Sequence, residues 1–181
     1  MKLDLSEILS HVGMRYTYEV EEAPIVDEDL ECVAPITGKI VFSNTGSVLL
    51  IDGSVETTVV LPCGRCLAYF REPIRLPVSE QFELESKPVG RGNRQTHVVL
   101  EEDESPIAGK LFDGPIFNLS EMLRQGIMLA LPTRPLHDED CKGLCARCGK
   151  DLNAGPCDCL PETAHPGLAK LGTLLQQKNK N

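Results

Sequence analysis

Seven of the eight cysteines in this 181-residue chain lie in two groups whose spacing is typical of metal ligands. A C-x-x-C pair places two thiolates on one tight turn, where both can reach the same tetrahedral ion. The first group is the pair Cys63 and Cys66; the second group is Cys141, Cys145, Cys148, Cys157 and Cys159. A single pair is shared with redox motifs, whereas two pairs followed by a C-x-C indicate zinc.

Seven cysteines are one ligand short of two tetrahedral sites, and His137, four residues before Cys141, supplies an eighth. One partition gives the first zinc ion Cys63, Cys66, His137 and Cys141, and the second Cys145, Cys148, Cys157 and Cys159. The alternative is a single ion held by the two C-x-x-C pairs. Cys32 lies apart in a strand-like stretch and is expected to be a buried, small hydrophobic residue.

Composition restricts the class of protein. The formal net charge is −9 and aromatic residues make up 4% of the chain, so a broad phosphate-binding or base-stacking surface is not expected. Any nucleic-acid contact must then be local or made through a partner. The sequence lacks the apolar run of a signal peptide and a segment long enough to span a membrane. We therefore expect a cytoplasmic protein whose thiols stay reduced.

The segments that position the cysteines are mostly β-like. A short helix is predicted over residues 3–12, and alternating or β-branched residues predict strands over 15–20, 31–34, 38–42, 48–51, 55–61, 68–76 and 78–84. Asn44-Thr45-Gly46 and Asp52-Gly53 are hairpin-turn signals. The first C-x-x-C pair then falls in the turn between two antiparallel strands. Pro73 and Pro77 predict that the strands after this pair lie at an edge or a bend.

From residue 118 the pattern is helical. Leu119, Met122, Leu123 and Ile127 fit one helix face, Asn118 with Glu121 resembles a capping box, and Pro132 should follow the helix end. The predicted fold is α+β: an antiparallel sheet or partial barrel with a packing helix and a zinc-stapled C-terminal segment. The predicted units are a β-rich domain at 1–136, a zinc-binding segment at 137–160, and a short helix with a disordered tail at 161–181.

Closed thiolate sites are structural, since catalytic zinc keeps an open position for water or substrate. The chain has no H-E-x-x-H, no G-x-S-x-G, no phosphate-binding glycine loop and no dinucleotide fingerprint. We therefore do not expect an enzyme.

The order of these motifs resembles the YceD family, the large ribosomal RNA subunit accumulation proteins. The resemblance is carried by LPCGRCL at 61–67, NLSE at 118–121, LALPTRPL at 129–136, CKGLCARCGKDLN at 141–153 and CDC at 157–159. It covers roughly residues 10–160. Many relatives have Cys where this chain has His137, which exchanges one zinc ligand for another. The resemblance implies a cytoplasmic bacterial factor in large-subunit ribosomal RNA synthesis, processing or stability, without catalytic residues.

Two hypotheses for the partner follow. In the first, the protein acts on large-subunit ribosomal RNA or its precursor, and Arg65, Lys142, Arg147 and Lys150 beside the cysteines contact phosphates. These four residues could equally offset the negative charge of the zinc–thiolate groups. In the second hypothesis the acidic surface docks on a basic ribosomal protein or RNA-processing enzyme without contacting RNA. A metal-dependent nuclease ranks third.

Overall fold

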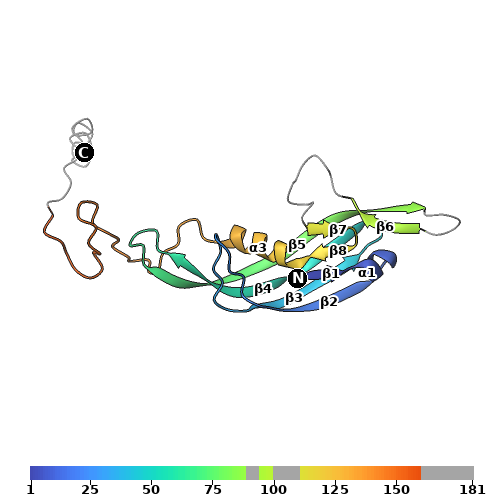
Figure 1. Ribbon diagram of the computed structural model, residues 1–181, viewed down its shortest axis with the longest axis horizontal. Helices are drawn as coiled ribbons and strands as arrows, with labels where there is room; N and C mark the ends of the chain where they lie inside the picture. The colour runs from blue at the N-terminus through green and yellow to red at the C-terminus, as the bar shows by residue number, and fades with distance from the viewer. Residues whose placement is uncertain (89–93, 100–110, 160–181) are drawn as a thin grey trace, which may run out of the picture.

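The described residues form two antiparallel sheets and one long helix in an elongated arrangement (Figure 1). The computed structural model describes residues 1–88, 94–99 and 111–159. The strands are β1 (Lys2–Asp4), β2 (Arg15–Glu22), β3 (Ile36–Asn44), β4 (Val48–Pro62), β5 (Tyr69–Pro88), β6 (Arg94–Val98), β7 (Phe112–Asp113) and β8 (Ile116–Asn118). The helices are α1 (Ser6–Ser10) and α3 (Leu119–Ala130). The larger sheet has the order β2-β3-β4-β5-β6 and the smaller one β1-β8-β7, so the predicted α+β class is confirmed and neither sheet closes into a barrel.

The core lies between one face of the larger sheet and the layer formed by the smaller sheet and the helices. Alternate residues of β3 and β4 point into it, among them Ile40, Phe42 and Ile51, which are fully buried. The Phe42 ring meets Phe117 of β8 edge-on, with 5.7 Å between ring centroids. The opposite face of the larger sheet carries exposed polar residues, among them Lys39 of β3 and Asp52 and Glu56 of β4.

Helix α3 begins and ends where its sequence predicts. The Asn118 side chain accepts a hydrogen bond from the Glu121 N–H, which satisfies a free donor of the first turn. Leu119, Met122, Leu123 and Ile127 are its buried residues. The helix ends at Ala130, and Pro132 and Pro135 follow it toward the second cysteine group. The helix therefore fixes where the segment after residue 131 starts.

The strands β4 and β5 form one long hairpin, of 15 and 20 residues, paired from Val48–Glu83 to Pro62–Tyr69. The predicted turn at Asp52-Gly53 is therefore wrong, because both residues lie inside β4. The glycine has another use: a Cβ at Gly53 would lie 2.1 Å from the Lys39 carbonyl oxygen of β3. Gly53 lets the two strands approach where any side chain would clash.

Three further predicted segments differ from the structure or lie outside its described residues. Only Ser6–Ser10 of the predicted helix 3–12 is helical, because Lys2–Asp4 pairs with β8 instead. Within the predicted strand 31–34, Glu31 and Cys32 make only isolated bridges, to Val26 and Val59, and Cys32 is buried as expected. The predicted helix and tail after residue 160 lie outside the described residues.

Pro73 and Pro77 lie in the part of β5 that pairs with β4 on one side and, among the described strands, with none on the other. This is the edge position that the sequence predicts. No helix in the described part of the chain has the length and apolar character needed to cross a membrane.

Replacing Gly53 by Ala should destabilise the sheet, because the new methyl group forces β3 and β4 apart. We expect a loss of about 1–3 kcal/mol in the free energy of unfolding, measured by chemical denaturation. The neighbouring substitution Ser54→Ala is the control and should change this value by less than about 0.5 kcal/mol. Equal effects of the two substitutions would contradict the close approach at Gly53.

Candidate metal centres

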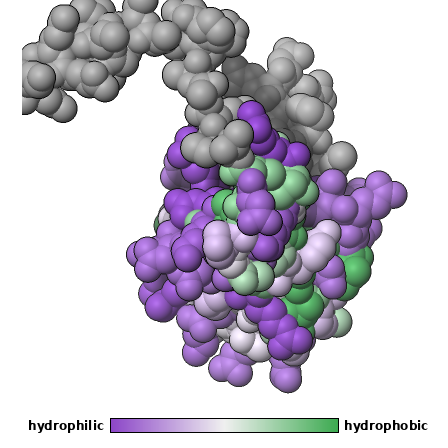
Figure 2. All heavy atoms as spheres, turned by 90° about the vertical axis from the view of Figure 1, so that its left-hand side faces the viewer, coloured by the Kyte–Doolittle hydropathy of each residue, from purple (hydrophilic) through white to green (hydrophobic). Residues whose placement is uncertain are grey.

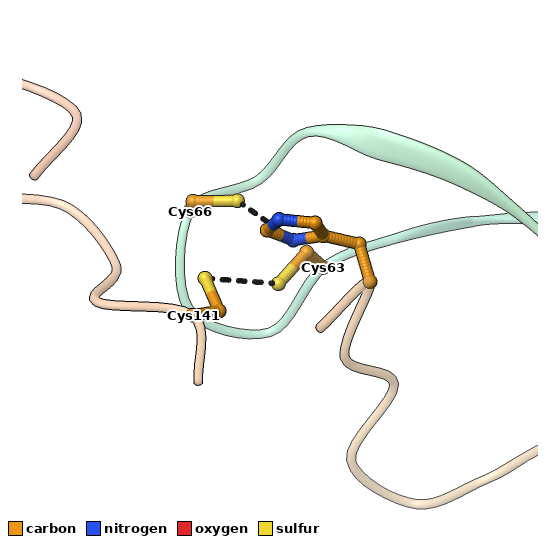
Figure 3. A group of neighbouring side chains, drawn as sticks. Cys63, Cys66 and Cys141 are labelled. Atoms are coloured by element: carbon orange, nitrogen blue, oxygen red, sulfur yellow. Dashed lines mark hydrogen bonds between the residues drawn. The ribbon is translucent and has the colours of Figure 1, made fainter. Parts of the chain in front are cut away.

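The first C-x-x-C pair lies in the turn between β4 and β5, as predicted. Its partners come from the segment after α3, so residues far apart in sequence meet at the tip of the hairpin (Figure 3). In this first cluster the sulfur atoms of Cys63, Cys66 and Cys141 and a ring nitrogen of His137 all lie within 4.8 Å of one another. The three cysteines are buried and His137 is exposed.

Two distances in the first cluster match the edges of a tetrahedral site. The Cys63 and Cys141 sulfurs are 3.8 Å apart, and the Cys66 sulfur is 3.4 Å from His137 Nδ1. With metal–ligand bonds of about 2.3 Å to sulfur and about 2.05 Å to nitrogen, a tetrahedron has edges of about 3.8 Å and about 3.6 Å. A disulfide would need about 2.05 Å between sulfurs. The cluster therefore could hold one metal ion.

The second cluster is formed by Cys145, Cys148, Cys157 and Cys159, whose sulfurs also lie within 4.8 Å of one another. All four come from residues 145–159, at the end of the molecule beyond the hairpin tip (Figure 1). Cys148 is exposed and the other three are half-buried. The structure thus groups the eight predicted ligands into the two sets of four that the sequence suggests, with one C-x-x-C pair in each.

The two C-x-x-C turns have the same backbone geometry. In the first, Leu67 N–H donates to Cys63 O at 3.0 Å and Cys63 N–H to Ala68 O at 2.9 Å. In the second, Gly149 N–H donates to Cys145 O at 2.9 Å and Cys145 N–H to Lys150 O at 2.8 Å. The residue after each pair has positive φ, +62° at Leu67 and +71° at Gly149. Glycine adopts this conformation freely, whereas a leucine pays about 1–2 kcal/mol.

Arg65 fastens the first turn to the segment after α3. Its guanidinium donates to the backbone oxygens of Glu139 at 2.9 Å and Cys141 at 2.8 Å, and its own carbonyl accepts from Leu144 N–H at 3.1 Å. Lys150 similarly donates to Pro156 O at 2.6 Å. Of the four basic residues predicted to contact RNA, these two are therefore engaged within the chain. Lys142 and Arg147 are exposed, and their side chains have no partner among the described residues.

Asn153 is a site residue that the sequence reasoning did not identify. Its side-chain amide donates to the Cys141 sulfur at 3.5 Å, and its Oδ1 accepts from Lys142 N–H at 2.8 Å. Asn153 thus joins the second C-x-x-C segment to a cysteine of the first cluster. The only local signal is the turn-forming pattern Asp151-x-Asn153, in which Asp151 Oδ1 accepts from Asn153 N–H at 2.9 Å.

Hydrogen bonds to sulfur decide which thiols ionise first in each cluster. Burial raises the pKa of Cys63, but the N–H groups of Cys66, His137 and Arg65 outweigh it and lower that pKa to about 5. The N–H groups of Cys148 and Arg147 lower the pKa of Cys145 to about 6. Cys159 donates to the sulfur of Cys148, and this with burial raises its pKa to about 12. Each cluster therefore contains at least one thiol that is ionised at neutral pH.

Alkylation should separate these thiols in protein kept metal-free with a chelator. A pH of 7 is above the Cys145 pKa of about 6 and far below the Cys159 pKa of about 12. Cys145 is then mostly thiolate and should react with iodoacetamide much faster than Cys159. The Cys145 rate should fall as pH drops through 6, because the thiolate takes up a proton. Peptide mass spectrometry measures both rates, with buried Cys32 as the unreactive internal reference. Similar rates for Cys145 and Cys159 would contradict the assignment.

The comparisons with known proteins agree on one family. The sequence pattern of the large ribosomal RNA subunit accumulation protein YceD matches residues 51–175, which include both clusters. A chloroplastic YCED homolog 1 of Arabidopsis thaliana, named for large ribosomal RNA subunit accumulation, is 26% identical over 93% of this chain and 55% of its own length.

Two mycobacterial proteins, both described as uncharacterized, are also similar. The one from Mycobacterium leprae is 29% identical over 70% of this chain and 54% of its own length. The one from Mycobacterium tuberculosis is 31% identical over 60% of this chain and 47% of its own length. The chain thus spans about half the length of the curated relatives it matches, and no solved structure matches it significantly. By the match over residues 51–175, this chain belongs to the YceD family of large ribosomal RNA subunit accumulation proteins.

Proposed function

We propose that this protein is a zinc-binding, non-enzymatic factor that supports the synthesis, processing or stability of large-subunit ribosomal RNA. Membership of the YceD family is the observation that carries the proposal. The proposal includes a cytoplasmic location, where ribosomal RNA is made and thiols stay reduced.

The ligand sets support zinc and a structural role for it. Three thiolates with one imidazole, and four thiolates, are both common zinc environments. Each cluster offers four ligand atoms, so a tetrahedral ion in either would have every position filled by the protein. Such an ion has no open position for a water or a substrate. The zinc in the first cluster would lock the hairpin tip to the segment after α3, and the zinc in the second would order residues 145–159.

Lys142 and Arg147 remain candidates for contact with RNA phosphates, because their side chains are exposed and unpartnered among the described residues. Arg65 and Lys150 fit a structural role better, since backbone oxygens already accept from them.

An acidic surface supports a second candidate, the adaptor that docks on a basic protein. Exposed carboxylates gather on β2 and the loop after it, at Glu19, Glu21, Asp27, Glu28, Asp29 and Glu31. Such a surface speeds encounter with a basic ribosomal protein or RNA-processing enzyme. Salt-sensitive binding to a basic protein without RNA would favour this candidate.

The purified chain should contain two zinc ions, measured by elemental analysis against protein concentration. Cys63→Ser and Cys148→Ser should each reduce the content to one. Cys63→Ser should lower the melting temperature more, because its cluster joins positions 78 residues apart, whereas the second lies within residues 145–159. Cys32→Ala is the control and should keep both ions. One ion in the unmodified chain would disprove the two-site partition.

Depletion of the protein in its source organism should lower the amount of mature large-subunit ribosomal RNA relative to small-subunit RNA. Quantitative RNA analysis measures the ratio, and in-cell crosslinking with sequencing locates the step. A plasmid copy should restore the ratio, and the Cys63→Ser variant should restore it poorly. An unchanged ratio after depletion would refute the proposed function, whatever the chain binds in vitro.

A further inference from the structure

The two matched C-x-x-C turns differ at one informative position. The second has Gly149 at the residue with positive φ, where the first has Leu67 at +62°. The Leu67 side chain is 62% exposed and so adds little to the core. A strained backbone conformation that holds an apolar side chain in solvent indicates that this side chain contacts a binding partner. Leu67 lies at the hairpin tip, and Figure 2 views this end of the molecule, where hydrophobic residues gather in small patches among hydrophilic ones.

The outward face of β5 begins at Tyr69, two residues after this leucine. Odd-numbered residues of the strand face solvent, while Ile74 and Val78 point into the core. We call the outward residues Tyr69, Arg71, Pro73 and Arg75 the Tyr69 strip. Tyr69 begins it and is 76% exposed, more than any other aromatic residue in the described chain. A shallow hollow lined by Thr58, Pro73 and Arg75, among others, lies at its far end.

The Tyr69 strip contains two arginines and no acidic residue, although the chain as a whole is acidic. Arg75 pairs with Glu56 of β4 at 3.4 Å, and both side chains are mostly exposed. Arg71 lies opposite Val60 and has no ion-pair or hydrogen-bond partner among the described residues. On the same sheet, β2 carries the acidic Glu19 and Glu21 instead. The Tyr69 strip therefore combines an exposed ring with guanidinium groups on one strand face.

We propose that Leu67 and the Tyr69 strip bind a single-stranded RNA segment. The Tyr69 ring stacks on one base, Leu67 packs beside it, and Arg71 and Arg75 contact phosphates along the strand. An exposed ring beside cationic side chains is the combination that binds unpaired bases and their backbone. The proposal rests on the proposed function for its ligand class, and it assigns contacts to residues outside the metal clusters.

Fluorescence anisotropy with a fluorescein-labelled 12-nucleotide oligouridylate tests the stacking contact on the full, metal-loaded chain. Tyr69→Ala should weaken binding about tenfold or more, whereas Tyr69→Phe keeps the ring and should change it little. Tyr16→Ala is the matched control, because Tyr16 is an exposed tyrosine on β2, at the other edge of the sheet. An unlabelled RNA duplex of the same length should compete poorly.

Two further variants separate binding from folding. Arg71→Gln should reduce the salt dependence of binding, lowering the slope of log affinity against log salt by about 0.7. Leu67→Gly should raise the melting temperature by about 2–4 °C, because it relieves the backbone strain, and yet weaken RNA binding. If Leu67 had a purely structural role, its replacement would not raise the melting temperature and lower the RNA affinity together.

The outcomes distinguish this proposal from the function on which it rests. If the unmodified chain binds the oligouridylate and the variants bind equally well, the Tyr69 strip is not the RNA surface, while the proposed function stands. If the chain binds no RNA but depletion still lowers the large-subunit ribosomal RNA, the strip proposal fails and the protein adaptor is favoured. If depletion changes nothing, the proposed function itself fails.

Discussion

The meeting of the β4–β5 turn with the segment after α3 is the contact that organises this protein. It brings Cys63 beside Cys141, 78 positions later, and it places buried sulfur atoms close enough to repel one another once ionised. Backbone N–H groups that donate to the Cys63 sulfur offset part of this repulsion. The Arg65 guanidinium donates to carbonyl oxygens of the segment after α3. The long hairpin, the end of α3 and the prolines after it all serve to make these segments converge.

The chain uses one backbone turn twice for different purposes. The first copy is built into the sheet, and its cysteines are buried between two distant segments. The second copy is local and more exposed, and it is attached to the first through Leu144 N–H on Arg65 O and the Asn153 amide on Cys141. These hydrogen bonds hold the second turn against the first.

Local patterns in the sequence predicted the features that local interactions decide. The limits of α3, its Asn118 cap, the turn at Cys63 and the grouping of Cys145, Cys148, Cys157 and Cys159 all follow from neighbours in the chain. The hairpin turn predicted at Asp52-Gly53 was wrong because this dipeptide suits both a tight turn and a close approach of two strands. Only the position of β3 distinguishes the two possibilities. The roles of Arg65 and Asn153 were not predictable, since their partners are set by how distant segments meet.

During translation the β4–β5 hairpin is synthesised before the segment that packs against its turn. Residues 48–88 contain both long strands, which pair with sequence neighbours and can form as soon as they are available. His137 and Cys141 are translated roughly fifty residues later, which at about 5–20 residues per second is a delay of about 3–10 s. In that interval Cys63 and Cys66 stand on a nearly finished hairpin without their partners. The speed of translation toward residue 141 therefore sets how long Cys63 and Cys66 are without His137 and Cys141 beside them.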